Sequence, residues 1–500
     1  MAAPHPSTTP TLRTRFGGAL ALIPVGLTAY IHYMITRGCF RADDFLNLYQ
    51  INNYSLPQYL IIPNAGHLLL ARNLVFYVSW LFFGTHAWPY LWSAFLTHLL
   101  NVWLLFLVID LFTRSRSAAV FGAAAWGVCS LHTSAVGYYA VYGHVMVGTI
   151  VLLVLLQVGL VARASTGPSS AMAALWYALA LVAATSFGTG IAFALALPFV
   201  LAVLLPRWRQ AWRLRVPLLS LLVVVPVLYF GLHWLYQMAF DQPRTVEPRF
   251  EMLLHAAPSA PLGFVRLLAF ALFRLLFDAL PPAATFPVAY AVLAVLAAAL
   301  GAVSWRAPAD MRRRIGACVL LTVSCYGILV MPRLSRIYDL PAQAMSNDGR
   351  FHYAPLIPVT ILFAFLWQWL SDRWPRASAL LIGAWCVSVV AASALSDPPP
   401  DRCIGSRRHL WKALVNIAGA IKWEPAGTTV VIPNRPFSTT AMPVVFPGWA
   451  GIFMIYYPDN IVDGKRVVFV EPDPLVREWA QKGRRSRTLL IPPAEERFTE

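Results

Sequence analysis

GGALALIPVGLTAYIHYMITRGCFRADD, residues 17–44, joins an apolar run of about 20 residues to two adjacent carboxylates, Asp43 and Asp44. A helix of that length crosses the hydrocarbon core of a bilayer. Two arginines precede the run and no small-residue cleavage site follows it, so we expect a retained membrane helix, not a signal peptide. Residues 1–396 contain only 11 Asp or Glu, and carboxylates near hydrocarbon persist chiefly when they pair, coordinate or react. The acidic pair is therefore a candidate reactive site, with an ordinary polar helix end as the alternative.

The composition is that of a polytopic α-helical membrane protein. Of the 500 residues, 58% are hydrophobic and 12% charged, and the mean hydropathy is +0.61. Soluble chains are roughly 45–50% apolar and about 25% charged. The formal charge of +17 comes from arginines in short connections between apolar runs, a pattern typical of cytoplasmic loops. No nucleic-acid motif accompanies them, so we expect no nucleic-acid partner.

The arginine clusters set the expected topology. About eleven transmembrane helices are predicted, at 17–36, 88–112, 117–133, 141–162, 171–187, 190–205, 216–238, 284–304, 315–331, 354–371 and 377–396. All basic clusters fall on one side if residues 1–16 are cytoplasmic, in a bacterial-type cytoplasmic (inner) membrane. Residues 17–396 then form one membrane module, with outer loops 37–87, 239–283 and 332–353. Within the second loop, residues 263–280 carry two arginines and an acid, and predict an amphipathic helix at the interface.

The tail, 397–500, differs from the rest of the chain. It gains lysines and acids, and alternates β-rich runs (TTVVIP, RVVFVEP, TLLIPP) with a helical pattern near 474–482. This predicts a small extracytoplasmic α/β domain. The six cysteines show no CxxC spacing. Cys39 and Cys403 would both lie outside, where they could either pair or remain as two thiols.

Further polar groups are expected on the same outer face as the acidic pair. The first outer loop adds an imidazole, His67, and a guanidinium, Arg72, both suited to binding phosphate oxygens. His132 and His144 flank a short outer turn, without the spacing of a metal site. The block 347–355, NDGRFHYAP, places Arg350, His352 and Tyr353 before a span, as a membrane-interface anchor or a phosphate clamp. In the second span, His98 and Asn101 share a helix face, which favours structural hydrogen bonds across helices.

Together these blocks resemble the membrane glycosyltransferases of the GT-C superfamily, most closely the protein O-mannosyltransferase-like branch. Four features match in order over roughly 17–370: the acidic pair, an H-x-x-N at His98 and Asn101, a Leu-His at 131–132, and the block 349–355. The resemblance implies a GT-C-like fold and an inverting transfer of a sugar from a polyprenyl-phosphate donor to a glycan, lipid or protein acceptor of the cell envelope.

The resemblance also implies residue roles. Asp43 would be the general base and Asp44 would orient it or the acceptor. Arg350, Arg72 and His67 would hold the leaving phosphate, with support from the residues His132, His144, His352 and Tyr353. No cofactor is required, although an adjacent Asp pair could coordinate Mg²⁺ or Mn²⁺. The expected partners are the donor, membrane lipid and the acceptor.

Several positions depart from the family pattern. Thr133 stands where a Pro is common, and an acid is missing near Gly137. A Ser-Lys pair is replaced in the stretch 186–188, Ser-Phe-Gly, and Gly349 occupies the place of an Asp. The losses of the Lys and the acid put the usual substrates in question, while Asp43 carries over more firmly than the phosphate ligands.

Two other functional classes stay open. An O-antigen-type polysaccharide ligase or polymerase would depend on a large outer loop, such as 239–262, in place of the early acidic pair. A lipid transporter or an assembly scaffold would be non-enzymatic. A transporter should show internal pseudo-symmetry or paired broken helices, and the nearest candidate here is the break at 187–190, which also fits a tight outer hairpin.

Overall fold

The computed structural model describes residues 19–38, 40, 42–64, 67–164, 167–205, 212–240, 260–277, 285–330, 349–395, 429–433, 461–462 and 465–470. The chain divides into two compact units. Unit 1 is Met1–Arg37, Leu60–Val75 and Tyr90–Asp397, and unit 2 is Gly38–Tyr59, Phe76–Pro89 and Pro398–Glu500. Each unit is described by itself.

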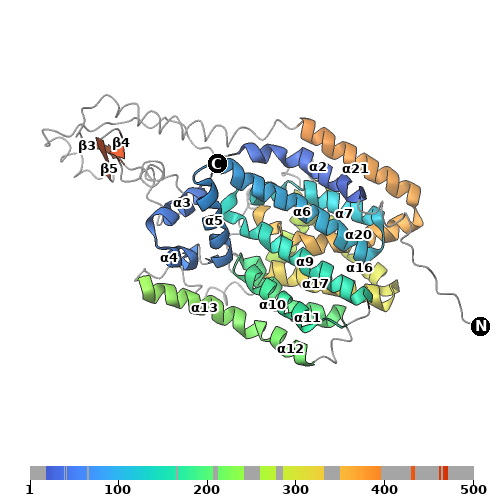
Figure 1. Ribbon diagram of the computed structural model, residues 1–500. Helices are drawn as coiled ribbons and strands as arrows, with labels where there is room; N and C mark the ends of the chain where they lie inside the picture. The colour runs from blue at the N-terminus through green and yellow to red at the C-terminus, as the bar shows by residue number, and fades with distance from the viewer. Residues whose placement is uncertain are drawn as a thin grey trace, which may run out of the picture. The chain divides into compact units, whose positions relative to one another are not determined.

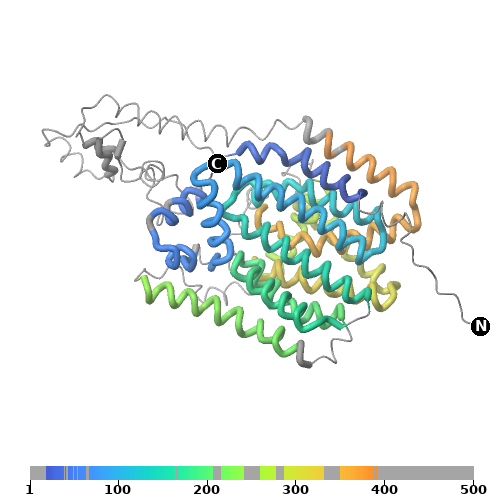
Figure 2. The backbone as a smooth tube through the Cα atoms, viewed as in Figure 1, coloured from blue at the N-terminus to red at the C-terminus, as the bar shows by residue number. Residues whose placement is uncertain are grey.

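Unit 1 is a helical bundle whose helices run side by side (Figure 1). Its longer elements are α2 (Leu22–His32), α6 (Ala87–Thr113, from Tyr90 on), α7 (Arg116–Val128), α9 (Gly143–Ala164), α10 (Ser170–Ala184), α11 (Gly188–Leu204), α13 (Leu221–Phe240), α15 (Ala260–Leu276), α16 (Thr285–Arg306), α17 (Ala309–Val330), α20 (Leu356–Arg373) and α21 (Pro375–Leu395). Its shorter elements are η1 (Ala19–Ala21), η2 (Tyr33–Arg37), α8 (Leu131–Val136), η3 (Tyr139–Val141), α12 (Trp212–Leu219), η8 (Gly349–His352) and a two-stranded pair, β1 (Pro63–Asn64) with β2 (His67–Leu68). The tube in Figure 2 follows α12 and α13 along one edge of this bundle.

Small residues let the central helices approach closely. Helix α7 packs against both α2 and α20, and buries nearly every residue from Ala118 to Val128. A Cβ on Gly122 would lie 2.8 Å from Cδ1 of Ile109, and one on Gly127 would lie 2.1 Å from Oγ1 of Thr28. Helices without a hydrophobic driving force between them associate through such small-residue contacts. Alanine and glycine in α7 therefore determine how tightly the bundle closes.

Serine caps fix where two helices begin. Ser115 accepts a hydrogen bond from the amide of Ala118 at 3.4 Å and starts α7. Ser169 accepts one from Met172 at 3.2 Å and starts α10. An N-cap hydroxyl satisfies one of the free amides of the first turn, so these serines separate α7 and α10 from the connections before them.

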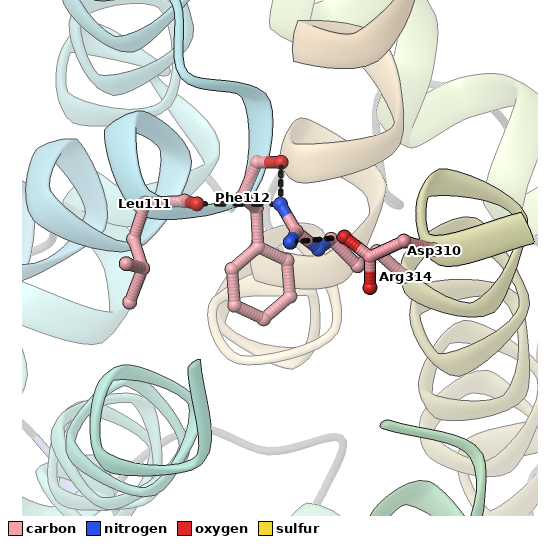
Figure 3. A network of polar contacts seen from close by, with 4 residues as sticks. All are labelled: Leu111, Phe112, Asp310 and Arg314. Atoms are coloured by element: carbon pink, nitrogen blue, oxygen red, sulfur yellow. Dashed lines mark hydrogen bonds and ion pairs between the residues drawn. The ribbon is translucent and has the colours of Figure 1, made fainter. Parts of the chain in front are cut away.

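Arginines from several helix connections gather at one end of the bundle, where Arg114 and Arg163 lie close enough to Arg314 to interact with it electrostatically. The carboxyl ends of α6, α9 and α11 and the amino end of α17 line a shared small cavity there. Arg314 of α17 donates to the carbonyls of Phe112 (2.5 Å) and Leu111 (3.4 Å) and pairs with Asp310 at 2.5 Å (Figure 3). The last carbonyls of a helix lack partners within it, so Arg314 caps α6 from a neighbouring helix. We call this the arginine end of unit 1.

Within the part of the chain that the structure describes, six helical segments are long and apolar enough to cross a membrane, which indicates a membrane protein: Ala19–Arg37, Ala87–Thr113, Tyr139–Ala164, Arg215–Phe240, Phe286–Arg306 and Ala309–Val330. The predicted spans at 117–133, 171–187 and 190–205 correspond to the shorter helices α7, α10 and α11, of 13, 15 and 17 residues. A helical membrane fold is thus supported, while the count of eleven spans is not confirmed.

The amphipathic helix expected near 263–280 is present as α15. One side of it is buried and Leu262 and Val265 are exposed. Its arginines reach other elements: Arg266 lies over the ring of Phe286, and Arg274 donates to Oγ of Ser130 at 2.9 Å. Phe286 lies at the start of α16, far from Arg306 at its end, and Ser130 follows the end of α7, far from Arg116 at its start.

In unit 2, helix α3 (Ala42–Asn53) follows the first span, and α4 (Leu56–Ile61) begins there. The carboxyl half of α5 (Leu70–Phe83) also belongs to this unit. In the tail, strand β5 (Lys465–Val470) pairs in parallel with β3 (Thr429–Pro433) and antiparallel with β4 (Ile461–Val462).

Two of the three predicted strands of the tail are therefore present. The third, at TLLIPP, and the helical pattern near 474–482 lie outside the described residues. So do Cys39 and Cys403, and the α/β domain stays a prediction.

Candidate functional site

The acidic pair lies in the first turn of α3. Asp44 is fully buried (0% exposed) and Asp43 is half-buried. Acids in the first turn are stabilised by the helix dipole. The turn is held by Asn47, which donates to the carbonyl of Asp43 at 2.6 Å and accepts from the hydroxyl of Tyr59 at 3.2 Å. The carboxylates thus sit on a braced helix end within unit 2.

A sharp break between α10 and α11 shapes the end of unit 1 that lies opposite the arginine end. A Cβ on Gly143 would lie 2.2 Å from the carbonyl oxygen of Ser186, and one on Gly190 would lie 1.8 Å from that of Ala183. Only glycine permits these approaches. The break is tied to the start of α5 as well, because the amide of Ala71 donates to the carbonyl of Thr185 at 3.0 Å.

The break brings two of the expected histidines together around one ring. The rings of His67 and Phe187 are 5.2 Å apart, and those of His144 and Phe187 are 3.7 Å apart, measured between centroids. His67 comes from β2 and His144 from the start of α9, 77 residues later in the sequence. The resemblance noted in the sequence predicts a lysine at position 187, where this chain has Phe187. The aromatic ring offers a packing surface to the two histidines.

Arg350 joins this group through a second phenylalanine. The ring of Phe351 lies 5.7 Å from that of His144, and the guanidinium of Arg350 lies 5.1 Å from the ring of Phe351 and 5.7 Å from that of Tyr138. These distances are in the range of cation–π contacts. His67, His144 and Arg350 are therefore connected through Phe187 and Phe351, and we call these five residues the outer ring cluster.

Tyr353, two residues after Phe351, is buried inside the bundle. Its hydroxyl lies 2.8 Å from Nδ1 of His98 and accepts from the amide of Asn101 at 3.1 Å. Asn101 also donates to the carbonyl of Val145 at 3.2 Å. The prediction that His98 and Asn101 hydrogen-bond across helices is confirmed. Burial raises the pKa of Tyr353 above its usual range, so the hydroxyl stays protonated.

His132 and His352 are buried near Tyr353. The ring of His132 packs between those of Trp126 (4.5 Å) and Tyr353 (4.7 Å). Nδ1 of His352 lies 3.2 Å from the hydroxyl of Tyr326. Burial lowers the pKa of His352 to about 3, so this imidazole is neutral at physiological pH. Both histidines pack inside the bundle, and their role in support of a phosphate site stays a prediction.

Arg72 is almost completely buried, at 1% exposed, and lies on the first turns of α5. Its burial distinguishes it from His67 and Arg350, which are half-buried. Among the described residues, no group of three or more His, Cys, Asp or Glu is arranged to bind a metal ion. The two carboxylates of α3 stay the predicted position for Mg²⁺ or Mn²⁺.

The aromatic contacts of the cluster were not predicted from the sequence. Phe187 and Phe351 join residues up to 283 positions apart, from His67 to Arg350, and Tyr138 adds a contact to Arg350 from outside the cluster. Aromatic residues are common in this chain, so no local signal separates these three from packing residues. Gly188 and Gly190, which follow Phe187, mark a tight hairpin in the sequence and are the one local signal for its position.

Comparison with known proteins gives a remote similarity. No protein-family model matches the chain, and neither does any curated protein. The crystal structure of the Archaeoglobus fulgidus oligosaccharyltransferase, in complex with Zn and sulfate, is similar at 13% identity and a TM-score of 0.39. The similarity covers 91% of this chain, which spans 62% of the length of that structure.

Proposed function

We propose that this chain is an inverting membrane glycosyltransferase of the GT-C type, which moves a sugar from a polyprenyl-phosphate donor to a cell-envelope acceptor. The observation that carries the proposal is the pair Asp43 and Asp44. It lies on the first turn of a braced helix directly after a membrane span, and one carboxylate is fully buried. Burial of a carboxylate is costly unless hydrogen bonds or an opposite charge compensate it, so a buried acid in a chain with so few acids is a candidate for a chemical role.

Direct displacement suits this pair. An acceptor hydroxyl attacks the anomeric carbon from the side opposite the phosphate, the new C–O bond forms, and the bond to the phosphate oxygen breaks with its electron pair. Asp43, the more exposed carboxylate, takes the hydroxyl proton, and Asp44 orients it or the acceptor. A divalent metal at the pair is compatible with this scheme but is not needed for it.

The outer ring cluster suits the leaving phosphate. Arg350 and His67 offer hydrogen-bond donors to phosphate oxygens, next to aromatic rings that match an apolar prenyl chain. Charge that develops on the phosphate in the transition state would be stabilised by the guanidinium. Arg72, whose side chain is almost completely buried, would add a further positive charge that stabilises the leaving phosphate.

The proposed setting is a bacterial-type cytoplasmic membrane with the amino terminus in the cytoplasm. The arginine end of unit 1 then faces the cytoplasm and the outer ring cluster faces the opposite side. The proposed acceptor is a glycan, lipid or protein, and the tail 397–500 would be extracytoplasmic.

Transfer of radiolabelled sugar tests the proposal. Purified protein in lipid is incubated with polyprenyl-phosphate sugars and a membrane extract that supplies acceptors. We expect Asp43→Asn to lower transfer at least a hundredfold, in the range of a lost general base. Asp372→Asn, which removes an exposed acid near the end of α20, should retain transfer.

Three results would contradict the proposal in different ways. Equal transfer by wild type and Asp43→Asn would show that Asp43 is not the general base. Loss of transfer on deletion of 239–262, with the acidic pair dispensable, would favour the ligase or polymerase class. No consumption of any donor would favour a transporter or scaffold.

A further inference from the structure

The hydrogen bonds of Tyr353 have one consistent direction. Nε2 of His98 lies 3.0 Å from the carbonyl oxygen of Gly127, which can only accept, so Nε2 carries the proton. In a neutral imidazole Nδ1 is then an acceptor, and the hydroxyl of Tyr353 must donate to it. The phenol oxygen is left to accept from Asn101. The Tyr353 hydroxyl therefore donates to His98 and accepts from Asn101, which fixes it in one orientation.

Packing fixes the same residue from the sides. A Cβ on Gly148 would lie 2.8 Å from Cε1 of Tyr353, so the ring presses directly on the backbone of α9. At the start of the same segment, a Cβ on Gly349 would lie 2.7 Å from the carbonyl oxygen of Leu131. The turn 349–353 is thus held at both ends, by a backbone contact at Gly349 and by a buried phenol at Tyr353.

Arg350 and Phe351 lie between these two fixed ends and are half-buried, while their neighbours are fully buried. Gly349, His352 and Tyr353 are thus buried in the bundle. Arg350 instead lies over the rings of Phe351 and Tyr138. Arg350 is a long, flexible side chain, and its starting point is set by a turn that is anchored two to three residues away.

We propose that the Tyr353 hydroxyl, held by His98 and Asn101, is a positioning group that fixes the turn 349–353 and thereby places Arg350 for binding a phosphate monoester. The inference rests on the proposed function, because it assigns Arg350 to the phosphate monoester that leaves when the sugar of the donor is transferred. Tyr353 itself lies inside the bundle and acts through Arg350.

Removal of the hydroxyl alone tests this. Tyr353→Phe keeps the ring but leaves Nδ1 of His98 without its donor and Asn101 without one acceptor. The probe is farnesyl phosphate, with farnesol as the analogue that lacks the phosphate, and binding is measured to protein in phosphatidylcholine nanodiscs. We expect Tyr353→Phe to weaken farnesyl phosphate binding about tenfold and to leave farnesol binding unchanged, as for loss of one to two hydrogen bonds.

A double-mutant cycle separates positioning from a general loss of packing. If Tyr353 acts through Arg350, Tyr353→Phe should have no further effect on binding in an Arg350→Ala background. The matched control is Tyr177→Phe, which removes a hydroxyl 3.3 Å from Oγ of Ser220 elsewhere in the bundle. This control should bind both probes as the wild type does. Additive losses in the cycle would overturn the proposal.

Amide hydrogen exchange supplies a readout that needs no ligand. Peptides that cover 349–353 should exchange at least about tenfold faster in Tyr353→Phe than in wild type or Tyr177→Phe. Unchanged exchange would overturn the anchoring step even if binding weakened. If exchange rises as expected but wild type binds farnesyl phosphate no better than farnesol, the anchor stands and the proposed donor site is wrong.

Discussion

At the scale of single residues, His352 links stability to pH. Burial lowers its pKa to about 3, against a reference value of 6.5. The unfolded chain therefore binds the proton more readily, and stability is full above pH 6.5 and falls as the pH drops towards 3. Between pH 7 and pH 5 the loss from this group is roughly 2 kcal/mol. We expect His352→Gln to show a smaller drop in melting temperature over that interval, measured in detergent.

The comparison uses the change with pH, since His352→Gln also alters the contact with Tyr326 at any one pH. His86→Gln, at an exposed position, is the control and should follow the wild type. An identical pH dependence in His352→Gln and wild type would mean that the imidazole is hydrated or open to protonation in the folded protein.

At the scale of elements, Arg314 joins α17 to the end of α6. Its side chain is 15% exposed and donates to two terminal carbonyls of α6. Arg314→Ala leaves those carbonyls without a partner, and we expect it to lower the free energy of unfolding by about 2 kcal/mol. Asp310→Asn should cost no more than about 0.5 kcal/mol, because Asp310 is 62% exposed and exposed ion pairs contribute little. Thermal unfolding of both variants measures the difference.

Arg313→Ala, at the exposed neighbour, is the control for loss of positive charge and should be near neutral. Equal losses in Arg313→Ala and Arg314→Ala would assign the effect to net charge and not to capping. The sequence predicted the cluster Arg312–Arg314 as a topology signal. It could not predict that one member caps another helix, because that depends on the tertiary position of Leu111 and Phe112, some 200 residues earlier.

At the scale of the whole molecule, patterns with a local physical cause were predictable. Apolar runs located most helices, and the spacing of His98 and Asn101 indicated their hydrogen bonds between helices. The number of membrane crossings was not predictable, because helices such as α7 and α10 are too short to be assigned as spans from hydropathy and length. The outer ring cluster also escaped prediction, since Phe187 acquires its neighbours only through the fold.

The arrangement of the bundle ends gives a prediction about sidedness. The carboxyl ends of α6, α9 and α11 meet the amino end of α17, so the connection before α7 should face the cytoplasm with the other arginines. In a variant without native cysteines, Ser117→Cys, in the first turn of α7, should react with a membrane-impermeant maleimide only after the cells are permeabilised. Ser55→Cys, exposed between α3 and α4 in the first outer loop, should react in intact cells. The reverse pattern would place the acidic pair in the cytoplasm and would remove the outer-face reaction with it.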